Sequence, residues 1–197
     1  MKCKTKREVK DPKAVFTTNG TPATRGVCSE CGTNVFKMGR TPAHEGLDPV
    51  EHVFISETRK AKLAKKPKMV IVESPAKART VGRFLGKKYR VRASVGHVRD
   101  LPSNRMGVDI ENDFEPRYIV PAKRKDVVRE LKADVKNSSE IYLATDPDRE
   151  GEAISWHLLQ ALKSAIGLLR PVHRVEFHEI THEAIEHAFA HPREIDM

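Results

Sequence analysis

Cysteine is scarce in this sequence, and its three cysteines all lie within the first 31 of 197 residues. Three thiols are too few, and odd in number, for the disulfide framework of a small secreted domain. Their clustering points instead to a local metal site. Aromatic residues make up only 6% of the chain, so an array of base-stacking side chains is not expected.

Long apolar runs are also missing. No stretch of about 18 apolar residues occurs, so the sequence predicts no membrane-spanning helix. The N-terminus, "MKCKTKREVKDPK", is basic but lacks the apolar stretch that a secretory signal requires. We therefore expect a cytoplasmic protein with no membrane partner.

Basic residues are in excess. Lys and Arg number 36 against 27 Asp and Glu, which gives a net charge of +9 and a pI near 9.5. This balance favours a polyanionic partner, with nucleic acid first among the candidates. The excess could equally belong to the Lys-rich surface of a soluble protein, and composition leaves both interpretations open.

The residue composition and periodicity change along the sequence and predict two unequal domains. Residues 1–45 are rich in turn-formers, and residues 46–67 form a basic linker or a short basic helix. From residue 68 to 197, short apolar runs alternate with segments of helical periodicity. Strands are expected at 69–73, 89–95, 140–145 and 173–180, and helices at 74–86, 123–137, 149–166 and after Thr181. This alternation predicts an α/β fold, a parallel sheet of about four strands flanked by helices.

Carboxylates crowd the start of the helix at 149–166. Asp146, Asp148 and Glu150 occupy every second position, and Glu152 follows. Glu150 and Glu152, taken singly, are ordinary first-turn charges that favour the helix dipole. Asp146 and Asp148 together, just after a strand, repel each other unless a cation lies between them, and Mg²⁺ suits such oxygen ligands.

A further acid is expected at the same edge of the sheet. Glu73 ends the strand at 69–73, and the carboxyl ends of parallel strands form one edge, where ligands bind. If the two strands are neighbours, Glu73 faces Asp146 and Asp148. Lys77, one turn into the following helix, could reach the same place. Carboxylates, a metal ion and a nearby cation suit chemistry on a phosphodiester.

Three sequence motifs resemble those of one family. "VIVESPAKARTVGRFLG", "SVGHVRDLP" and "TDPDREGEAISWHL" are similar to the toprim domain of bacterial type IA DNA topoisomerases, in the topoisomerase I branch. The resemblance covers 68–197 and implies the toprim (Rossmann-like) fold. It also implies Mg²⁺-dependent cleavage of one DNA strand, strand passage and religation, which relaxes negative supercoils. The implied partners are a single-stranded DNA segment and further domains of the same polypeptide, in a monomer.

The resemblance also implies roles for individual residues. Glu73 is expected near the scissile phosphate, as a metal ligand or proton shuttle. The Mg²⁺ site is expected to combine it with Asp146, Asp148 and Glu150. Lys77 and Arg149 are expected at DNA phosphates in the catalytic centre. DNA contacts are also expected from two residues of the "GHVRDLP" word, His97 and Arg99.

One part of the family pattern is missing. The nucleophilic tyrosine of the family lies in an Arg-Thr-Asp-Ser-like context, and none of Tyr89, Tyr118 and Tyr142 has it. We therefore expect an N-terminal piece of the enzyme that is inactive by itself. Two other hypotheses stay open: a non-catalytic zinc-containing, basic nucleic-acid-binding module with a toprim fold, and a toprim nuclease or primase.

The cysteines resemble part of a zinc ribbon. Cys28-x-x-Cys31 followed by Gly32 has the spacing of a zinc knuckle. Cys3 is a third candidate ligand, and His44 or His52 could be a fourth. The alternative is three reduced thiols that bind no metal. Trp156, the single tryptophan, is expected to pack against the sheet.

Overall fold

The computed structural model describes residues 8–49, 51–168 and 170–195. The chain divides into two compact units, residues 1–61 with 167–169, and residues 62–166 with 170–197. The domain limits at 45 and 67 stay a prediction. Within the described ranges, no helix is both long and apolar enough to cross a bilayer.

The first unit contains a three-stranded antiparallel sheet. Its strands β1 (Val9–Phe16), β2 (Pro22–Cys28) and β3 (Asn34–Met38) follow one another in space as in sequence. We did not expect this sheet, because its strands mix small, polar and charged residues without a clean alternation. A short 3₁₀ turn, η1 (Pro42–His44), places His44 in the interior of this unit.

The basic segment after this sheet forms the helix α1 (Glu57–Ala64), which buries none of its residues. It matches the short basic helix that was one of the two expectations for residues 46–67. An ion pair between Lys60 and Glu57, 3.4 Å long, is exposed at both ends and contributes little to stability.

The second unit is built on a parallel sheet. Its strands are β4 (Lys68–Val72), β5 (Tyr89–Ala93), β8 (Ile141–Leu143) and β9 (Val172–Arg174), in the order β5-β4-β8-β9. All neighbours are parallel, so the predicted α/β fold is confirmed. β9 ends at Arg174, earlier than expected, although the Val175 N–H still donates to the Leu143 carbonyl over 2.9 Å. Val175 and Phe177 are buried in one cluster with Ile185 and Ala188 of the last helix.

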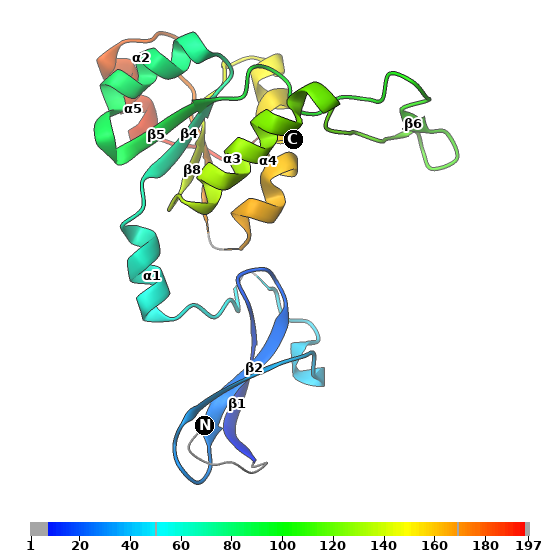
Figure 1. Ribbon diagram of the computed structural model, residues 1–197, viewed down its shortest axis with the longest axis vertical. Helices are drawn as coiled ribbons and strands as arrows, with labels where there is room; N and C mark the ends of the chain where they lie inside the picture. The colour runs from blue at the N-terminus through cyan, green and yellow to red at the C-terminus, as the bar shows by residue number, and fades with distance from the viewer. Residues whose placement is uncertain (1–7, 50, 169, 196–197) are drawn as a thin grey trace. The chain divides into compact units, whose positions relative to one another are not determined.

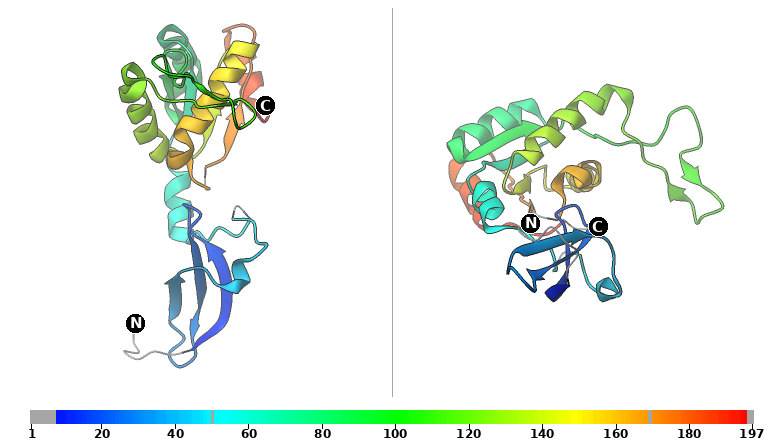
Figure 2. Two further views of the ribbon diagram at one scale, coloured as in Figure 1. Left: turned by 90° about the vertical axis from the view of Figure 1, so that its right-hand side faces the viewer. Right: turned by 60° about the horizontal axis from the view of Figure 1, so that its bottom comes forward.

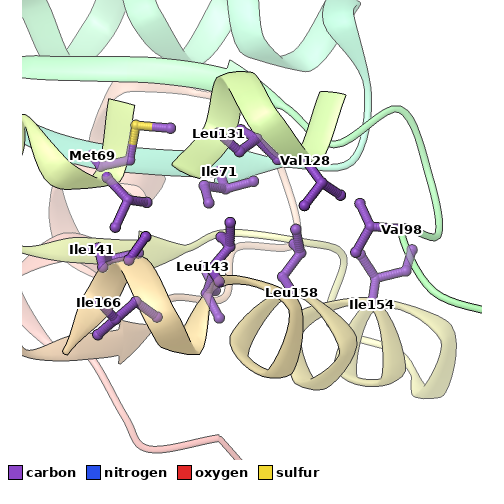
Figure 3. Close-up of a cluster of buried hydrophobic side chains, with 13 residues drawn as sticks. Met69, Ile71, Val98, Val128, Leu131, Ile141, Leu143, Ile154, Leu158 and Ile166 are labelled. Carbon is purple, nitrogen blue, oxygen red and sulfur yellow. The ribbon is translucent and has the colours of Figure 1, made fainter. Parts of the chain in front are cut away.

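Helices cover both faces of this sheet (Figure 1). α2 (Pro75–Leu85) and α5 (His182–Ala190) lie on one face, and α3 (Lys125–Lys136) and α4 (Arg149–Ile166) on the other. Successive residues of a strand point to opposite faces. Met69 and Ile71 of β4 accordingly join the core against α3 and α4, shown in Figure 3, while Val70 and Val72 join the core against α2 and α5.

Capping residues and short 3₁₀ turns mark where the helices of this unit begin and end. Pro75 occupies the first turn of α2, and the Ser74 side chain accepts a hydrogen bond of 3.2 Å from the Lys77 N–H, as a cap does. Gly86, with φ of 68°, ends α2, and the short 3₁₀ turns η2 (Gly86–Lys88) and η3 (Ala122–Arg124) precede β5 and α3. The helix expected after Ser74 is therefore present.

A hairpin arm extends from the second unit. It carries two short strands, β6 (Val108–Asp109) and β7 (Glu115–Pro116), and reaches away from the helices (Figures 1 and 2). Met106 and Phe114 on this arm are 67% and 62% exposed. The arm lies outside the strands and helices expected from the sequence, and it adds almost nothing to the core.

Candidate active site

The candidate site lies at the carboxyl ends of β4 and β8, which are neighbours in the sheet. Glu73 directly follows β4, and Asp146 comes three residues after β8. The Ala144 N–H donates to the Ile71 carbonyl over 2.8 Å, so the backbone pairing continues almost to this edge. Two segments far apart in sequence therefore end at one place.

Lys77 joins the two acids. Its Nζ forms ion pairs with Glu73 and, at 2.5 Å, with Asp146 Oδ1. The Lys77 side chain is only 10% exposed, whereas that of Asp146 is 52% exposed. The ammonium group thus sits inside the edge, and the Asp146 carboxylate lies between it and solvent.

The pKa values follow from this contact. The hydrogen bond from Lys77 lowers the pKa of Asp146 below its ordinary value, against the opposing effect of burial. Burial by itself would lower the pKa of Lys77, but hydrogen bonds to Asp146 and Glu73 outweigh it and raise that pKa. Lys77 is therefore cationic and Asp146 anionic at neutral pH.

Asp148 and Glu150 have other partners. Asp148 Oδ1 accepts a hydrogen bond of 2.6 Å from the Gly151 N–H and so caps the first turn of α4. Glu150 Oε1 faces His97 Nε2 at 3.6 Å. The structure brings Glu73, Lys77 and Asp146 together but engages the next two acids locally. Among the residues that it describes, no three His, Cys, Asp or Glu side chains are grouped to hold a metal ion.

One observation nevertheless fits a hard cation at this edge. Glu73 Oε2 is buried and has no hydrogen-bond partner among the described residues. A buried oxygen without a partner costs free energy unless an ion or a water completes it. The donors nearby are carboxylates, the ligand type that Mg²⁺ prefers. The chemistry of the site therefore fits Mg²⁺, although Lys77 occupies the space between two of the acids.

A cluster of aromatic and cationic side chains begins beside Glu150. The Arg99 guanidinium lies 5.1 Å from the centre of the Tyr118 ring and 5.5 Å from that of Trp156, and His157 is edge-on to Tyr118 at 4.6 Å. Trp156 thus packs on Arg99 and Tyr118, so the expectation that it packs against the sheet was wrong. Arg149 is exposed at the start of α4 and forms no ion pair with a described residue.

Two buried nitrogens in this cluster lack partners. They are Arg99 Nη1 and His157 Nδ1, and neither forms a hydrogen bond within the described ranges. Burial, together with the charges of Arg99 and His97, lowers the pKa of His157, so this ring is neutral at neutral pH. The cluster offers unused nitrogens next to the acidic edge.

Sequence reasoning missed Arg174, a buried residue that holds the loop carrying Asp146 in place. Its side chain is fully buried, and Nε donates to Glu152 Oε2 over 2.8 Å. Its Nη atoms donate to the carbonyls of Leu143, Thr145 and Asp146 at 3.2, 2.8 and 2.7 Å. Arg174 therefore fixes the loop that carries Asp146. The available signal was its position inside the strand expected at 173–180.

A second arginine extends this network towards solvent. Arg193 donates to Glu152 Oε2 over 2.9 Å and to Glu176. The hydrogen bond from Arg193 is the main reason that the pKa of Glu176 is lowered. Arg174, Glu152, Arg193 and Glu176 thus alternate in charge, and Glu152 belongs to this support rather than to the acidic edge.

The cysteine turn lies between β2 and β3. Cys28 is buried at the end of β2, and its carbonyl accepts from the Gly32 N–H over 3.1 Å. His44 is 2% exposed, and its ring nitrogens contact Thr41 and the Ala23 carbonyl, so it has a packing role. Cys3 lies outside the described residues, and zinc binding by Cys3, Cys28 and Cys31 stays a prediction.

Comparison with known proteins finds relatives for both parts of the chain. The family model for the toprim domain matches residues 68–180, more than half of the chain, and that for a domain of unknown function (DUF5679) matches residues 1–38. The solved full-length topoisomerase I from Thermotoga maritima, in a monoclinic crystal form, is similar at 43% identity with a TM-score of 0.57. The similarity covers 65% of this chain and 21% of that chain.

Proposed function

The chain belongs to the toprim family, and we propose that it supplies the acidic half of a type IA DNA topoisomerase active site. One observation carries the proposal: Glu73 after β4 and Asp146 after β8 converge on Lys77 at a single edge. Glu73, Lys77 and Asp146 lie within sequence motifs similar to those of topoisomerase I. In this proposal the substrate is a single-stranded segment of DNA.

The acids would hold Mg²⁺. Glu73, Asp146 and Asp148 would be its ligands, with Glu150 next to them, and the bound ion would supply positive charge to the scissile phosphodiester. Asp148 would keep its role as the cap of α4, since a carboxylate has two oxygens and only Oδ1 is engaged by Gly151.

The remaining residues would bind the DNA and move a proton. Lys77 and the exposed Arg149 would offset charge that develops on the phosphate, and His97 and Arg99 would contact neighbouring phosphates. Glu73 would shuttle a proton: it would take the proton of the attacking hydroxyl and pass it to the 3′-oxygen that leaves on cleavage, and religation would reverse this transfer.

The attacking hydroxyl would come from outside the three tyrosines of this chain. Tyr142 is 6% exposed within the core, Tyr89 packs edge-on against it at 6.0 Å, and Tyr118 is held by Trp156 and His157. None of the three tyrosines lies at the acidic edge, and none has the sequence context of the family's nucleophile. The chain would therefore act with further domains that bring the nucleophile, and would not relax DNA by itself.

A Mg²⁺ titration followed by thermal unfolding tests the metal part. At tenfold excess over Kd the ion should stabilise the protein by about 1.4 kcal/mol, which raises Tm by about 3 to 6 °C in a domain of this size. Asp146→Asn with Asp148→Asn should abolish this rise. The matched control, Asp113→Asn with Glu115→Gln on the hairpin arm, removes equal charge and should keep it. An unchanged rise in the Asp146/Asp148 variant would refute the assignment.

A chimera tests the reaction. Residues 68–197 of this chain would replace the matching segment of the Thermotoga maritima enzyme, and relaxation of negatively supercoiled plasmid would be followed on gels. We expect Mg²⁺-dependent relaxation, and a loss of about a hundredfold or more on Glu73→Gln, because a positioned proton donor contributes about that much. Circular dichroism would confirm that both chimeras fold. Full activity with Glu73→Gln would contradict the role of this acid.

A further inference from the structure

The helix α3 sorts its charges into separate faces. Lys125, Arg129, Lys132 and Lys136 recur at helical spacing and share one face; we call these four residues the α3 stripe. The acids of the helix lie on the adjacent face, and its buried apolar residues, Val128, Leu131 and Val135, face the core. Positive charge is therefore concentrated along one exposed line.

This arrangement costs stability. Like charges three or four residues apart in a helix repel by a few tenths of a kcal/mol each. Only Arg129 is compensated, by an exposed ion pair of 2.9 Å with Asp126. The side chains of Lys125, Lys132 and Lys136 form no ion pair with any residue that the structure describes. The uncompensated repulsion would be relieved by a bound polyanion.

The stripe borders a shallow groove. The groove has a volume of about 550 Å³ and is lined by the four cations together with Val120, Val128 and Ala133. Its lining contains neither an aromatic ring nor a carboxylate. Such a surface attracts phosphates and sugars but has nothing on which a base could stack.

The length of the stripe matches a nucleic-acid backbone. Its ends are eleven residues apart, which corresponds to about 17 Å along a helix. One strand of B-DNA places a phosphate every 3.4 Å or so along its axis, so this length spans about five phosphates. Duplex DNA has the denser charge, because its two strands together carry one charge per about 1.7 Å.

We propose that the α3 stripe is a second DNA-binding surface, which holds the phosphate backbone of a duplex without regard to sequence. This goes beyond the proposed function, because it needs neither the acidic edge nor a metal ion. Binding there would hold duplex DNA on the α3 and α4 layer of the sheet (Figure 1).

The test measures duplex binding across a salt series. The full chain would carry Gln at all four stripe positions, and binding of a fluorescein-labelled duplex would be followed by anisotropy. Removal of one cation from a phosphate should reduce the slope of log K against log salt by about 0.9, so the slope should fall by about 3 to 4. Affinity at low salt should drop about tenfold or more. Gln keeps the helix propensity of Lys and Arg, and circular dichroism would check folding.

A matched control separates the stripe from net charge. Arg79, Arg83, Lys87 and Lys88, on α2 and η2, lie on the opposite layer and are exposed. Changing these four to Gln removes the same charge and should leave the slope nearly unchanged. Equal reductions in the two variants, or no reduction in the stripe variant, would overturn the proposal.

Two further results keep this proposal distinct from the proposed function. Asp146→Asn with Asp148→Asn should not weaken duplex binding, and the stripe variant should keep its Mg²⁺-dependent rise in Tm. Loss of duplex binding in the Asp146/Asp148 variant would place that binding at the acidic edge and would overturn the stripe. A failed Mg²⁺ response with intact stripe binding would count against the proposed function alone.

Discussion

Replacing Gly151 with alanine is expected to destabilise the protein by about 3 kcal/mol, the upper part of the usual range for overpacking. A Cβ atom at this position would lie 2.0 Å from the backbone oxygen of Asp146, a distance at which the backbone itself must move. Gly151 is also held on both sides, because its N–H donates to Asp148 and its carbonyl accepts from Thr145. The clash therefore cannot be relieved by a side-chain rotation.

Gly82 in α2 provides the control. A Cβ there would meet Val91 at 3.6 Å, an ordinary contact, and alanine is favoured over glycine in a helix by up to about 1 kcal/mol. Urea unfolding should thus show a loss of stability for Gly151→Ala, and unchanged or greater stability for Gly82→Ala. Similar free energies of unfolding for the two variants would show that Gly151 is not in close contact with the loop.

Replacing Arg174 with methionine is expected to cost about 3 to 5 kcal/mol, as is usual when one member of a buried ion pair is removed. The change leaves Glu152 without its Nε partner and deprives the carbonyls of Thr145 and Asp146 of their donors. Methionine fills similar space, so the loss of stability comes from the missing hydrogen bonds rather than from a cavity. Denaturant unfolding at neutral pH measures it.

Arg193→Met is the comparison. Arg193 contacts the same two acids, Glu152 and Glu176, but its side chain is 38% exposed. Water can replace its hydrogen bonds, and we expect a cost of about 1 kcal/mol, as for exposed pairs. If the two arginine variants unfold at the same denaturant concentration, the buried network around Arg174 is not a main support of the loop.

Much of the second unit could be predicted from the sequence. The apolar run of β4, the Ser-Pro start of α2 and the acids at the start of α4 each carry a local signal, and local signals survive folding. The convergence of Glu73 and Asp146 followed from the rule that parallel strands end at one edge. The four-strand sheet is confirmed by the structure and by the family match.

The rest depended on contacts that a sequence does not display. Lys77 was expected near the acids, but its place between two of them results from packing. Asp148 could be a ligand or a cap, and only the position of Gly151 decided that it caps α4 in this structure. The sheet β1-β2-β3 was missed because its strands lack a two-residue period, and Arg174 because a buried charge is rare unless it is paired.

The central strand β4 links the packing of the two helix layers. Four of its five residues, Met69 to Val72, alternate between the two cores, so neither helix layer can loosen without removing support from the same short segment. Glu73 is the next residue along the chain. Loss of packing on either face of the sheet would therefore shift this carboxylate. The distance between the carboxylates of Glu73 and Asp146 thus depends on the packing of both helix layers.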